Sequence, residues 1–319
     1  MNIYIIPDFI YSKSAGKFWV AGFFLVPQCF QVSLPLRSNL MDKRLLTIQD
    51  ISCVGQCSLT VALPIISACG IETAVLPSSV LSTHTAGFSG FTFRDLTDDM
   101  EGILAHWNKE GLKFDAFYTG YVSKSQIPLI LKIMEETANP GALRIVDPVM
   151  ADHGKLYPGF DADFPAEMAK LCKGADVIMP NLTEAAFLLN EKYVGDNFES
   201  DDYDEAYIVG LLERLMGLGA KKVLLTGVCY DPRELGCVCY DGTKLEYYFR
   251  KRLNAQMHGT GDVFASSVAG ALCRGKSLID AAALGADFVI ESMKATLDDK
   301  SHWYGVKFEK ALPWLVQHI

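Results

Sequence analysis

The sequence predicts an α/β fold with a mostly parallel central sheet covered by helices on both faces. Two observations lead to this prediction. From Met41 onward, short apolar runs alternate with helical patterns, and each apolar run ends in polar or glycine-rich residues. Strands that alternate with helices form parallel sheets whose two faces are both buried. Half of the 319 residues are hydrophobic, so the chain can also bury a large core.

The elements follow from the spacing of the apolar residues. Strands are expected at Arg44–Gln49, Thr73–Val80, Ala116–Gly120, Leu143–Val146, Val177–Met179 and Val223–Thr226. Helices are expected at Ser58–Cys69, Thr97–Glu110, Ser125–Thr137, Pro165–Cys172, Thr183–Leu189, Tyr203–Leu218, Asp262–Arg274, Leu278–Leu297 and Phe308–Val316. Residues 234–250 alternate around an Asp-Gly pair, which predicts a hairpin. The acidic run Asp196–Glu205 is expected to be a solvated loop that leads into a helix.

Residues 1–40 differ from the rest of the chain. Their apolar segment Phe18–Phe30 is too short to span a bilayer and is broken by Pro27. Residues from Met41 to Asp50 have the charged flank and apolar run of a first strand. We therefore expect an N-terminal extension over residues 1–40 and one functional domain over residues 41–319.

The charge and cysteine content restrict the function. A formal net charge of -9 and a pI near 5.2 argue against a nucleic-acid partner, which would require clustered Lys and Arg. No segment predicts a membrane partner, and small-molecule chemistry fits better. Nine cysteines, scattered through apolar segments, do not form a disulfide framework. Reduced thiols and a cytoplasmic location are therefore expected.

The stretch Asn254–Asp262 predicts a turn that opens a buried helix. Gly259 and Gly261 bracket Thr260, so an anion can approach the backbone and the first N–H groups of the helix. Asp262 is the side chain in this turn that can accept a proton. A strand-to-helix turn with Asp262 as a cap explains these residues equally well. In either case, a carboxylate at a helix N-terminus is expected to have a lowered pKa.

Polar residues that follow the first two strands suggest a small-molecule site, because ligands bind at the carboxyl ends of parallel strands. Ser52 follows the first strand, and Ser58 precedes the next helix, where it is also a natural helix cap. His84 and Thr85 lie in a loop with further hydroxyl groups and an aromatic ring, a composition suited to a planar heteroaromatic ligand. A lone histidine is, however, more often structural.

Carboxylates follow the fourth and fifth strands. Asp147 and Asp152 follow the fourth strand and could hold a hard cation. Asn181 and Glu184 follow the fifth strand, and they are oxygen ligands of the kind that Mg²⁺ prefers, directly or through water. Taken alone, Asn181 and Glu184 are better explained as a capping box. Together with an anion site at Gly259–Gly261, the strand ends indicate a phosphoryl-transfer centre.

Four motifs, in this order and spacing, resemble the ribokinase-like superfamily: Asp147-Pro-Val-Met150, Pro180-Asn-x-x-Glu184, Leu225-Thr-Gly227 and Gly259-Thr-Gly-Asp262. Further segments resemble the pyridoxal kinases within that superfamily: Ile48-Gln49, Ser52-Cys-Val-Gly55, Ser82-x-His84-Thr85 and Thr119-Gly120-Tyr121. The resemblance runs from about Lys43 to near the C-terminus. Each piece is weak, but the ordered set is specific.

The resemblance implies a single three-layer α/β/α sandwich, a homodimer, and transfer of the ATP γ-phosphate to the 5′-hydroxymethyl group of a vitamin B6 vitamer. It also implies site roles. Asp262 would be the base and Gly259–Gly261 the anion hole. Asn181 and Glu184 would bind the Mg²⁺–phosphate complex through water, with Asp152 near the metal. Thr226 and Gly227 would lie near the nucleotide, Ser52, His84, Thr85 and Tyr121 would bind the substrate, and a requirement for K⁺ is left open.

The chain also departs from the family pattern on the substrate side. Asp50 stands where the family often has Ser, and Cys57 and Ser58 lie where it often has Gly-Asn. Hydroxymethylpyrimidine kinases share the fold and use a similar alcohol, so they are the alternative enzyme. The alternative without catalysis is a ligand-binding homologue that has lost turnover. The intact Asp262 argues against it.

Overall fold

The computed structural model describes residues 4–6, 9–11, 43–195 and 203–319. The apolar segment 18–30 and residues 196–202 of the acidic run, on which two of the predictions above rest, lie outside them. The chain divides into two units, Met1–Leu40 and Met41–Ile319. In the first unit, β1 (Tyr4–Ile6) pairs antiparallel with β2 (Phe9–Tyr11). Among the described residues, no helix has both the length and the apolar character needed to cross a membrane.

The second unit is built on a nine-stranded sheet with the order β13-β12-β11-β10-β7-β6-β3-β4-β5. The central strands are parallel: β3 (Arg44–Ser52), β4 (Glu72–Leu81), β6 (Phe114–Thr119), β7 (Ala138–Val146), β10 (Val177–Ile178) and β11 (Val223–Val228). Both edges are antiparallel, formed by β5 (Phe93–Asp95) on one side and by β12 (Glu234–Tyr240) and β13 (Leu245–Lys251) on the other. The carboxyl ends of the parallel strands therefore meet along one edge.

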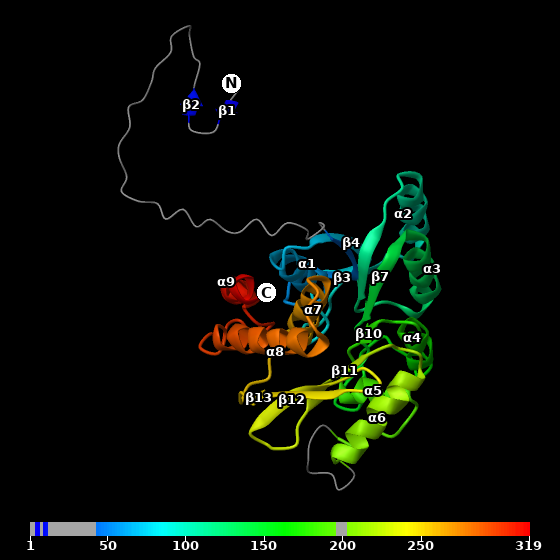
Figure 1. Ribbon diagram of the computed structural model, residues 1–319, viewed down its shortest axis with the longest axis vertical. Coiled ribbons are helices and arrows are strands. Elements are labelled where there is room, and N and C mark those ends of the chain that lie inside the picture. Colours follow the sequence, from blue (N-terminus) through cyan, green and yellow to red (C-terminus); the bar gives the residue numbers. More distant parts are fainter. Residues whose placement is uncertain (1–3, 7–8, 12–42, 196–202) are drawn as a thin grey trace, which may run out of the picture. The chain divides into compact units, whose positions relative to one another are not determined.

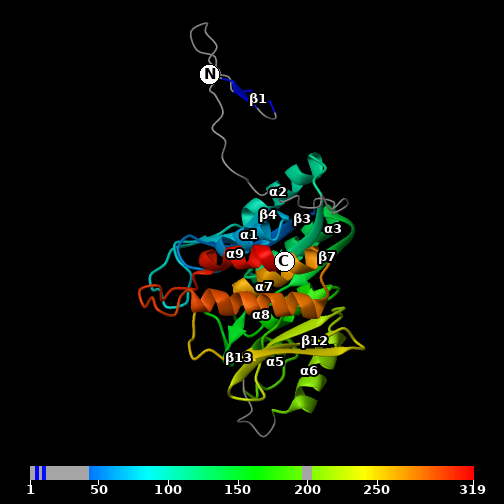
Figure 2. The same cartoon turned by 60° about the vertical axis from the view of Figure 1, so that its left-hand side comes forward.

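Helices cover both faces of this sheet, as the two views in Figures 1 and 2 show. One face carries α1 (Leu59–Ala68), α7 (Thr260–Cys273), α8 (Leu278–Lys294) and α9 (Phe308–His318). The other face carries α2 (Thr97–Lys109), α3 (Ile127–Thr137), α4 (Phe164–Cys172), α5 (Leu182–Leu188) and α6 (Glu205–Gly217). The expected three-layer α/β/α sandwich is confirmed.

Each face of the sheet has its own apolar core. Successive residues of β3 point to opposite faces, so Leu46 and Ile48 join the core under α2–α6 while Leu45 joins the core under α1 and α7–α9. The second core is rich in small residues, because α7 contributes Ala265, Ala269 and Ala271, all almost fully buried. Small residues also allow α7 to pack closely against its neighbouring helices: an added Cβ on Gly270 of α7 would lie 2.6 Å from Cys69 Sγ at the end of α1, and one on Gly285 of α8 would lie 3.1 Å from Phe264 of α7.

Every predicted strand and helix of the described chain is present, with shifted ends. α7 begins at Thr260, two residues before the prediction, and β7 begins at Ala138 rather than Leu143. The first residues of β7 include Pro140 and other residues typical of turns, so the sequence pattern does not predict a strand there. β5 and the two-residue strands β8 (Ala151–Asp152) and β9 (Lys155–Leu156) were not predicted, because such short segments show no periodicity. The predicted helix Ser125–Thr137 begins as a turn of 3-10 helix at Lys124–Gln126, and α3 follows from Ile127.

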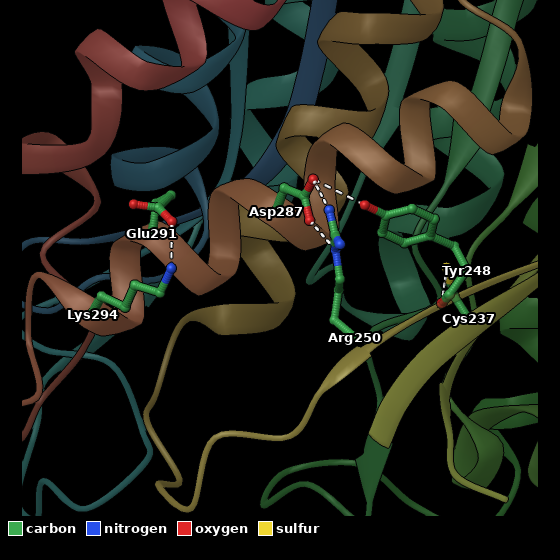
Figure 3. A network of polar contacts seen from close by, with 6 residues as sticks. All are labelled: Cys237, Tyr248, Arg250, Asp287, Glu291 and Lys294. Carbon is green, nitrogen blue, oxygen red and sulfur yellow. Dashed lines mark hydrogen bonds and ion pairs between the residues drawn. The ribbon is translucent and has the colours of Figure 1, made fainter. Parts of the chain in front are cut away.

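A polar contact ties the edge hairpin to α8. Figure 3 shows two side chains of β13, Arg250 and Tyr248, reaching the same carboxylate, that of Asp287 on α8. Arg250 donates to it from Nε at 2.6 Å and from Nη2 at 2.7 Å, and the Tyr248 hydroxyl donates at 2.9 Å. This two-pronged geometry fixes orientation better than a single ion pair does. The contact helps to hold the segment between β13 and α7, which leads directly to the predicted catalytic turn.

Candidate active site

The predicted site residues lie at the carboxyl ends of the parallel strands. The β3–α1 loop contacts three segments that are distant in sequence. An added Cβ on Gly55 would lie 2.0 Å from Cδ2 of His84, one on Gly259 would lie 1.9 Å from the Gln56 carbonyl oxygen, and one on Gly305 would lie 2.4 Å from Cβ of Gln56. The loop after β3, the loop after β4, the start of α7 and the segment before α9 thus meet at one place.

The turn at Gly259–Gly261 has the backbone that an anion site requires. Gly259 is the N-cap of α7 with φ 79°, a left-handed conformation that glycine adopts readily. The first intrahelical bond is donated by Val263 to Gly259 O, so the N–H groups of the three residues before Val263 precede the helical ladder. A Cβ added at Gly261 would meet nothing within 4 Å, which leaves open space beside these N–H groups.

Asp262 is half-buried on the first turn of α7. The Ser58 backbone N–H and the Cys57 thiol lie near its carboxylate and favour the charged form. Burial, and then the negative charge of Asp50, raises the pKa of Asp262 to about 7. The expectation of a lowered pKa is therefore wrong, because desolvation and a second carboxylate outweigh the helix N-terminus. A carboxyl group with a pKa near neutrality is well suited to act as a general base.

Asp50 is the second carboxylate on the substrate side, and it is only 4% exposed. The Ser52 hydroxyl donates to Asp50 Oδ2 at 2.9 Å, and the Ser58 hydroxyl lies near the same carboxylate. Burial raises the pKa of Asp50, whereas the two hydroxyl groups lower it. Ser52, predicted to bind substrate, is thus fully buried and orients Asp50.

His84 is 4% exposed, and both of its ring nitrogens contact the protein. Nε2 lies 2.7 Å from the Tyr304 carbonyl oxygen, and Nδ1 accepts from the Ala86 N–H at 3.1 Å. These partners assign the ring proton to Nε2. Any contact of His84 with a substrate would therefore use the ring face, which packs near Phe88 and His258.

Thr85 and Tyr121, the other predicted substrate residues, are both half-buried. The Tyr121 ring lies 5.1 Å from the Phe160 ring, centroid to centroid. Burial and the nearby Asp50 charge raise the pKa of Tyr121, so this phenol lies on the same side of the site as Asp50. Thr85 lies in the loop after β4, one residue beyond His84. The substrate role of both residues stays a prediction.

Replacing His84 by alanine should mainly destabilise the fold. The variant leaves the Tyr304 carbonyl and the Ala86 N–H without their partners, which should lower the free energy of unfolding by about 1–3 kcal/mol. Urea unfolding measures this loss. If His84 instead serves the substrate, the variant should keep its stability and show a higher KM for the alcohol substrate alone.

Asn181 and Glu184 form the capping box of α5. The Glu184 N–H donates to Asn181 Oδ1 at 2.9 Å, and the Asn181 N–H donates to Glu184 Oε2 at 2.9 Å. Glu184 Oε1 also accepts from the Met150 N–H at 3.1 Å, and Asn181 Nδ2 donates to the Ala151 carbonyl at 2.9 Å. The capping alternative is therefore correct as local structure. It places both side chains against the segment that carries Asp152.

Two buried carboxylates near this box fit a site for a divalent cation. Burial, and then the nearby Glu184 and Asp262 charges, raises the pKa of Asp147 well above its ordinary value. Burial likewise raises the pKa of Glu184 to about 8, against the two backbone N–H groups that donate to its carboxylate. Neither carboxylate has an ion pair in the described part of the chain, and a divalent cation would relieve their repulsion. Asp152 is more exposed and lies 3.6 Å from His153 Nε2.

Across residues 43–195 and 203–319, no group of three or more His, Cys, Asp or Glu residues converges closely enough to hold a metal ion directly. A magnesium ion that keeps several of its waters needs only one or two protein carboxylates together with substrate phosphates. The donor set of Asp147, Asp152 and Glu184 fits that kind of site.

Thr226 and Gly227, predicted to lie near the nucleotide, end the neighbouring strand. Thr226 forms a bridge to Asn181, and its N–H donates to the Pro180 carbonyl at 3.0 Å. Gly227 has φ 79° at an irregularity in the β11–β12 ladder. This bulge interrupts the regular pairing of β11 with β12 near the capping box. Thr226 and Gly227 therefore lie beside the residues that are predicted to hold the metal ion.

Two hollows lie outside this constellation. The larger one is lined by Glu205, Tyr230, Tyr247 and Phe249 and contains none of the predicted residues. A polar hollow of about 340 Å³ lies between β13 and α7, lined by Pro232 and by residues 252–256, including Arg252. The residues that line the second hollow precede the Gly259–Gly261 turn in the chain.

Sequence reasoning missed a polar layer beneath the site. Four polar atoms there are buried without a hydrogen-bond partner among the described residues: Gln49 Oε1, Tyr118 Oη, Thr119 Oγ1 and Ser266 Oγ. Gln49 and Thr119 were noted only as parts of motifs, and an added Cβ on Gly120 would lie 2.7 Å from the Gln49 oxygen. The sequence feature that could have revealed this layer is the presence of polar residues within otherwise apolar strands, because polar side chains are costly to bury.

Comparison with known proteins identifies the family. Residues 71–306 match the phosphomethylpyrimidine kinase family. A pyridoxal kinase of Dictyostelium discoideum is 25% identical over 72% of this chain and 78% of its own length. A hydroxymethylpyrimidine/phosphomethylpyrimidine kinase of Rhizobium meliloti is 26% identical over 71% of this chain and 81% of its own.

Solved structures give the same result at higher identity. A Bacteroides thetaiotaomicron protein, named provisionally as a phosphomethylpyrimidine kinase and crystallised with pyridoxal, is 35% identical, with a TM-score of 0.81 over 88% of this chain and 97% of that one. A pyridoxal kinase of Lactobacillus plantarum is 33% identical, with a TM-score of 0.78 over 86% of this chain and 97% of that one. Both substrate classes thus occur among its relatives.

Proposed function

Because this chain belongs to the phosphomethylpyrimidine kinase family of ATP-utilising kinases, we propose that it phosphorylates the 5′-hydroxymethyl group of a vitamin B6 vitamer: pyridoxal, pyridoxamine or pyridoxine. The observation that carries the reaction type is Asp262, a carboxyl group with a pKa of about 7 beside the open N-terminus of α7. The pyridoxal in the Bacteroides thetaiotaomicron structure supports the substrate class.

In this proposal Asp262 orients the substrate hydroxyl and accepts its proton as the bond to phosphorus forms. The Gly259–Gly261 backbone N–H groups stabilise charge on the moving phosphoryl group. Bound Mg²⁺ would neutralise phosphate charge, and Asp147, Asp152 and Glu184 would hold it, partly through water. We also propose a homodimer, which the pyridoxal kinase resemblance implies.

The competing enzyme is a hydroxymethylpyrimidine kinase, which the family and the Rhizobium meliloti relative favour. The test is ATP consumption with pyridoxal, pyridoxamine, pyridoxine and hydroxymethylpyrimidine, each with detection of the phosphorylated product. We expect turnover of at least one vitamer at a higher kcat/KM than that of the pyrimidine. Turnover of the pyrimidine alone would move the function to the competitor. Binding without any turnover would indicate a ligand-binding homologue.

Glu184→Gln should raise the Mg²⁺ concentration needed for half-maximal activity. The amide keeps the length of the side chain and one oxygen for the capping box, but it removes the charge facing Asp147. Loss of a residue that supports a metal site typically costs about 10-fold or more in metal affinity. The measurement is kcat against free Mg²⁺ at saturating ATP.

The control for this variant is Ser277→Ala, which removes the N-cap of α8, where Ser277 accepts from the Asp280 N–H at 3.2 Å. Loss of a cap costs about 1 kcal/mol of stability and should leave the Mg²⁺ dependence unchanged. If Glu184→Gln behaves like Ser277→Ala, Glu184 serves only as a cap.

A further inference from the structure

The segment before α9, residues 302–306, is fastened to two other segments of the candidate active site. The Tyr304 carbonyl oxygen lies 2.7 Å from Nε2 of His84, in the loop after β4. The Val306 N–H donates to the carbonyl oxygen of His258, which directly precedes the glycine turn, at 3.2 Å. Figure 2 shows the segment, in red, beside the loop after β4, in cyan. Its backbone is therefore held in place at the substrate side of the site.

Trp303 lies in this segment, and its ring is the outer end of a row of four rings. The Trp303 and Phe88 ring centroids are 4.7 Å apart, with the ring planes at 47°. Phe88 lies edge-on to His84 at 5.0 Å, and His84 lies 5.5 Å from His258. The row of rings thus runs from the surface to the residue before Gly259, where the predicted anion site begins.

Gly87 shows how closely Trp303 approaches the inner end of this row. An added Cβ on Gly87 would lie 2.9 Å from Cζ3 of Trp303 and 3.8 Å from Nε2 of His258. A single methyl group at this position would therefore touch both rings. Gly87 also has φ 87°, a left-handed conformation that favours glycine. The loop after β4 thus keeps Trp303 close to the segment that opens α7.

Trp303 remains 49% exposed despite these contacts. A single exposed apolar side chain needs no explanation in general. Trp303 differs because its backbone is fixed on both sides and its ring ends a row that begins beside the catalytic turn. An exposed indole face binds planar rings by offset stacking. The pyridine ring of a B6 vitamer and the pyrimidine ring of the competing substrate are both planar.

We propose that Trp303, packed on Phe88, stacks on the ring of the alcohol substrate and is a residue that determines its specificity. This inference rests on the proposed kinase function and adds the segment before α9 to the substrate side. Stacking requires a flat ring but no particular hydrogen-bonding groups on it. Trp303 therefore favours aromatic alcohols over sugars and accepts pyridine and pyrimidine rings alike.

Trp303→Ala should weaken binding of the alcohol substrate about 10-fold, because stacking on an aromatic side chain contributes about that factor or more. Calorimetry on the full chain measures this affinity for pyridoxal, pyridoxamine, pyridoxine and hydroxymethylpyrimidine. ATP affinity should stay unchanged. Since the ring is stacked both before and during the transfer, KM for the alcohol should rise while kcat changes little.

Two further variants separate stacking from packing. Trp303→Phe keeps a flat ring and should bind the alcohol within about 3-fold of the parent. Trp303→Leu keeps apolar bulk against Phe88 but has no flat face, so it should bind as weakly as Trp303→Ala. Leu297→Ala is the matched control, since Leu297 is an apolar side chain of similar exposure, 44%, at the end of α8. It should leave the affinity unchanged.

The fluorescence of Trp303 provides a direct measurement. The chain has four tryptophans, so variants are needed to assign the signal. A ring stacked on Trp303 should quench its emission, and most of this quenching should be absent from Trp303→Phe although the alcohol still binds. Trp314→Phe is the control, because the Trp314 ring on α9 stacks on His318 at 4.1 Å, and this variant should keep the quenching.

An unchanged affinity in Trp303→Ala, or parental affinity in Trp303→Leu, would overturn the inference. If Trp303→Ala does not fold, the comparison of Trp303→Phe with Trp303→Leu provides the same test. Calorimetry needs no turnover, so the two proposals can fail separately. Turnover of a vitamer with an unmoved affinity in Trp303→Ala would refute stacking alone. Binding of the pyrimidine alone, weakened in Trp303→Ala, would refute the vitamer substrate and support stacking.

Discussion

Asp262→Asn should lower kcat by ~10²–10⁴-fold while leaving ATP affinity nearly unchanged. The amide has the same size and keeps an oxygen near the Ser58 N–H and the Cys57 thiol, so the turn should keep its shape. What is lost is the ability to take the substrate proton. Single-turnover kinetics at saturating ATP, with nucleotide affinity measured by calorimetry, separate these two effects.

The parent enzyme should also show the titration of this group. Activity requires the ionised carboxylate, and the pKa of Asp262 is about 7, so kcat should rise with pH up to a plateau above that value. The acidic limb should be absent from the residual activity of Asp262→Asn. Its matched control is Asp280→Asn, since Asp280 is the third residue of α8 as Asp262 is of α7. A kcat for Asp262→Asn within a few-fold of the parent would show that the turn is only a scaffold.

The sequence predicted the sandwich well because parallel strands buried on both faces leave long apolar runs that polar residues interrupt only at strand ends. The same logic located the site, since Asp147, Asn181 and the residues after β3 all follow such runs. It failed for β8 and β9, whose two-residue pairing around His153 and Gly154 leaves no periodic signal.

The electrostatics of the site were beyond reach of the sequence. A helix N-terminus alone would lower the pKa of Asp262, but the shift is reversed by burial and by Asp50, which lies 212 positions earlier in the chain. Similarly, the sequence presents Glu184 either as a helix cap or as a metal ligand. In the structure Glu184 forms the capping box, and the pKa of its carboxyl group is also raised to about 8. One residue can serve both roles, because the two backbone donors to its carboxylate leave lone pairs free.

Gly259→Ala should destabilise the protein and lower kcat by about 100-fold. Alanine at φ 79° costs about 1 kcal/mol from the backbone alone, and its Cβ would lie 1.9 Å from the Gln56 carbonyl oxygen. That contact is with backbone, so the turn or the β3–α1 loop must move. A displacement of about 1 Å at a catalytic group can cost about 100-fold in rate.

Gly275→Ala, just beyond the other end of α7, is the control for this effect. Gly275 has φ 86°, but an added Cβ there meets nothing within 4 Å. Gly275→Ala should therefore lower the melting temperature, because alanine is strained at this positive φ, and leave kcat unchanged, because no contact is disturbed. Because the Gln56 carbonyl faces Gly259 while Cys57 and Ser58 lie near Asp262, a shift of this loop should displace the base and the phosphoryl site together. Equal kcat values for Gly259→Ala and Gly275→Ala would mean that this close approach does not set the geometry of the reaction.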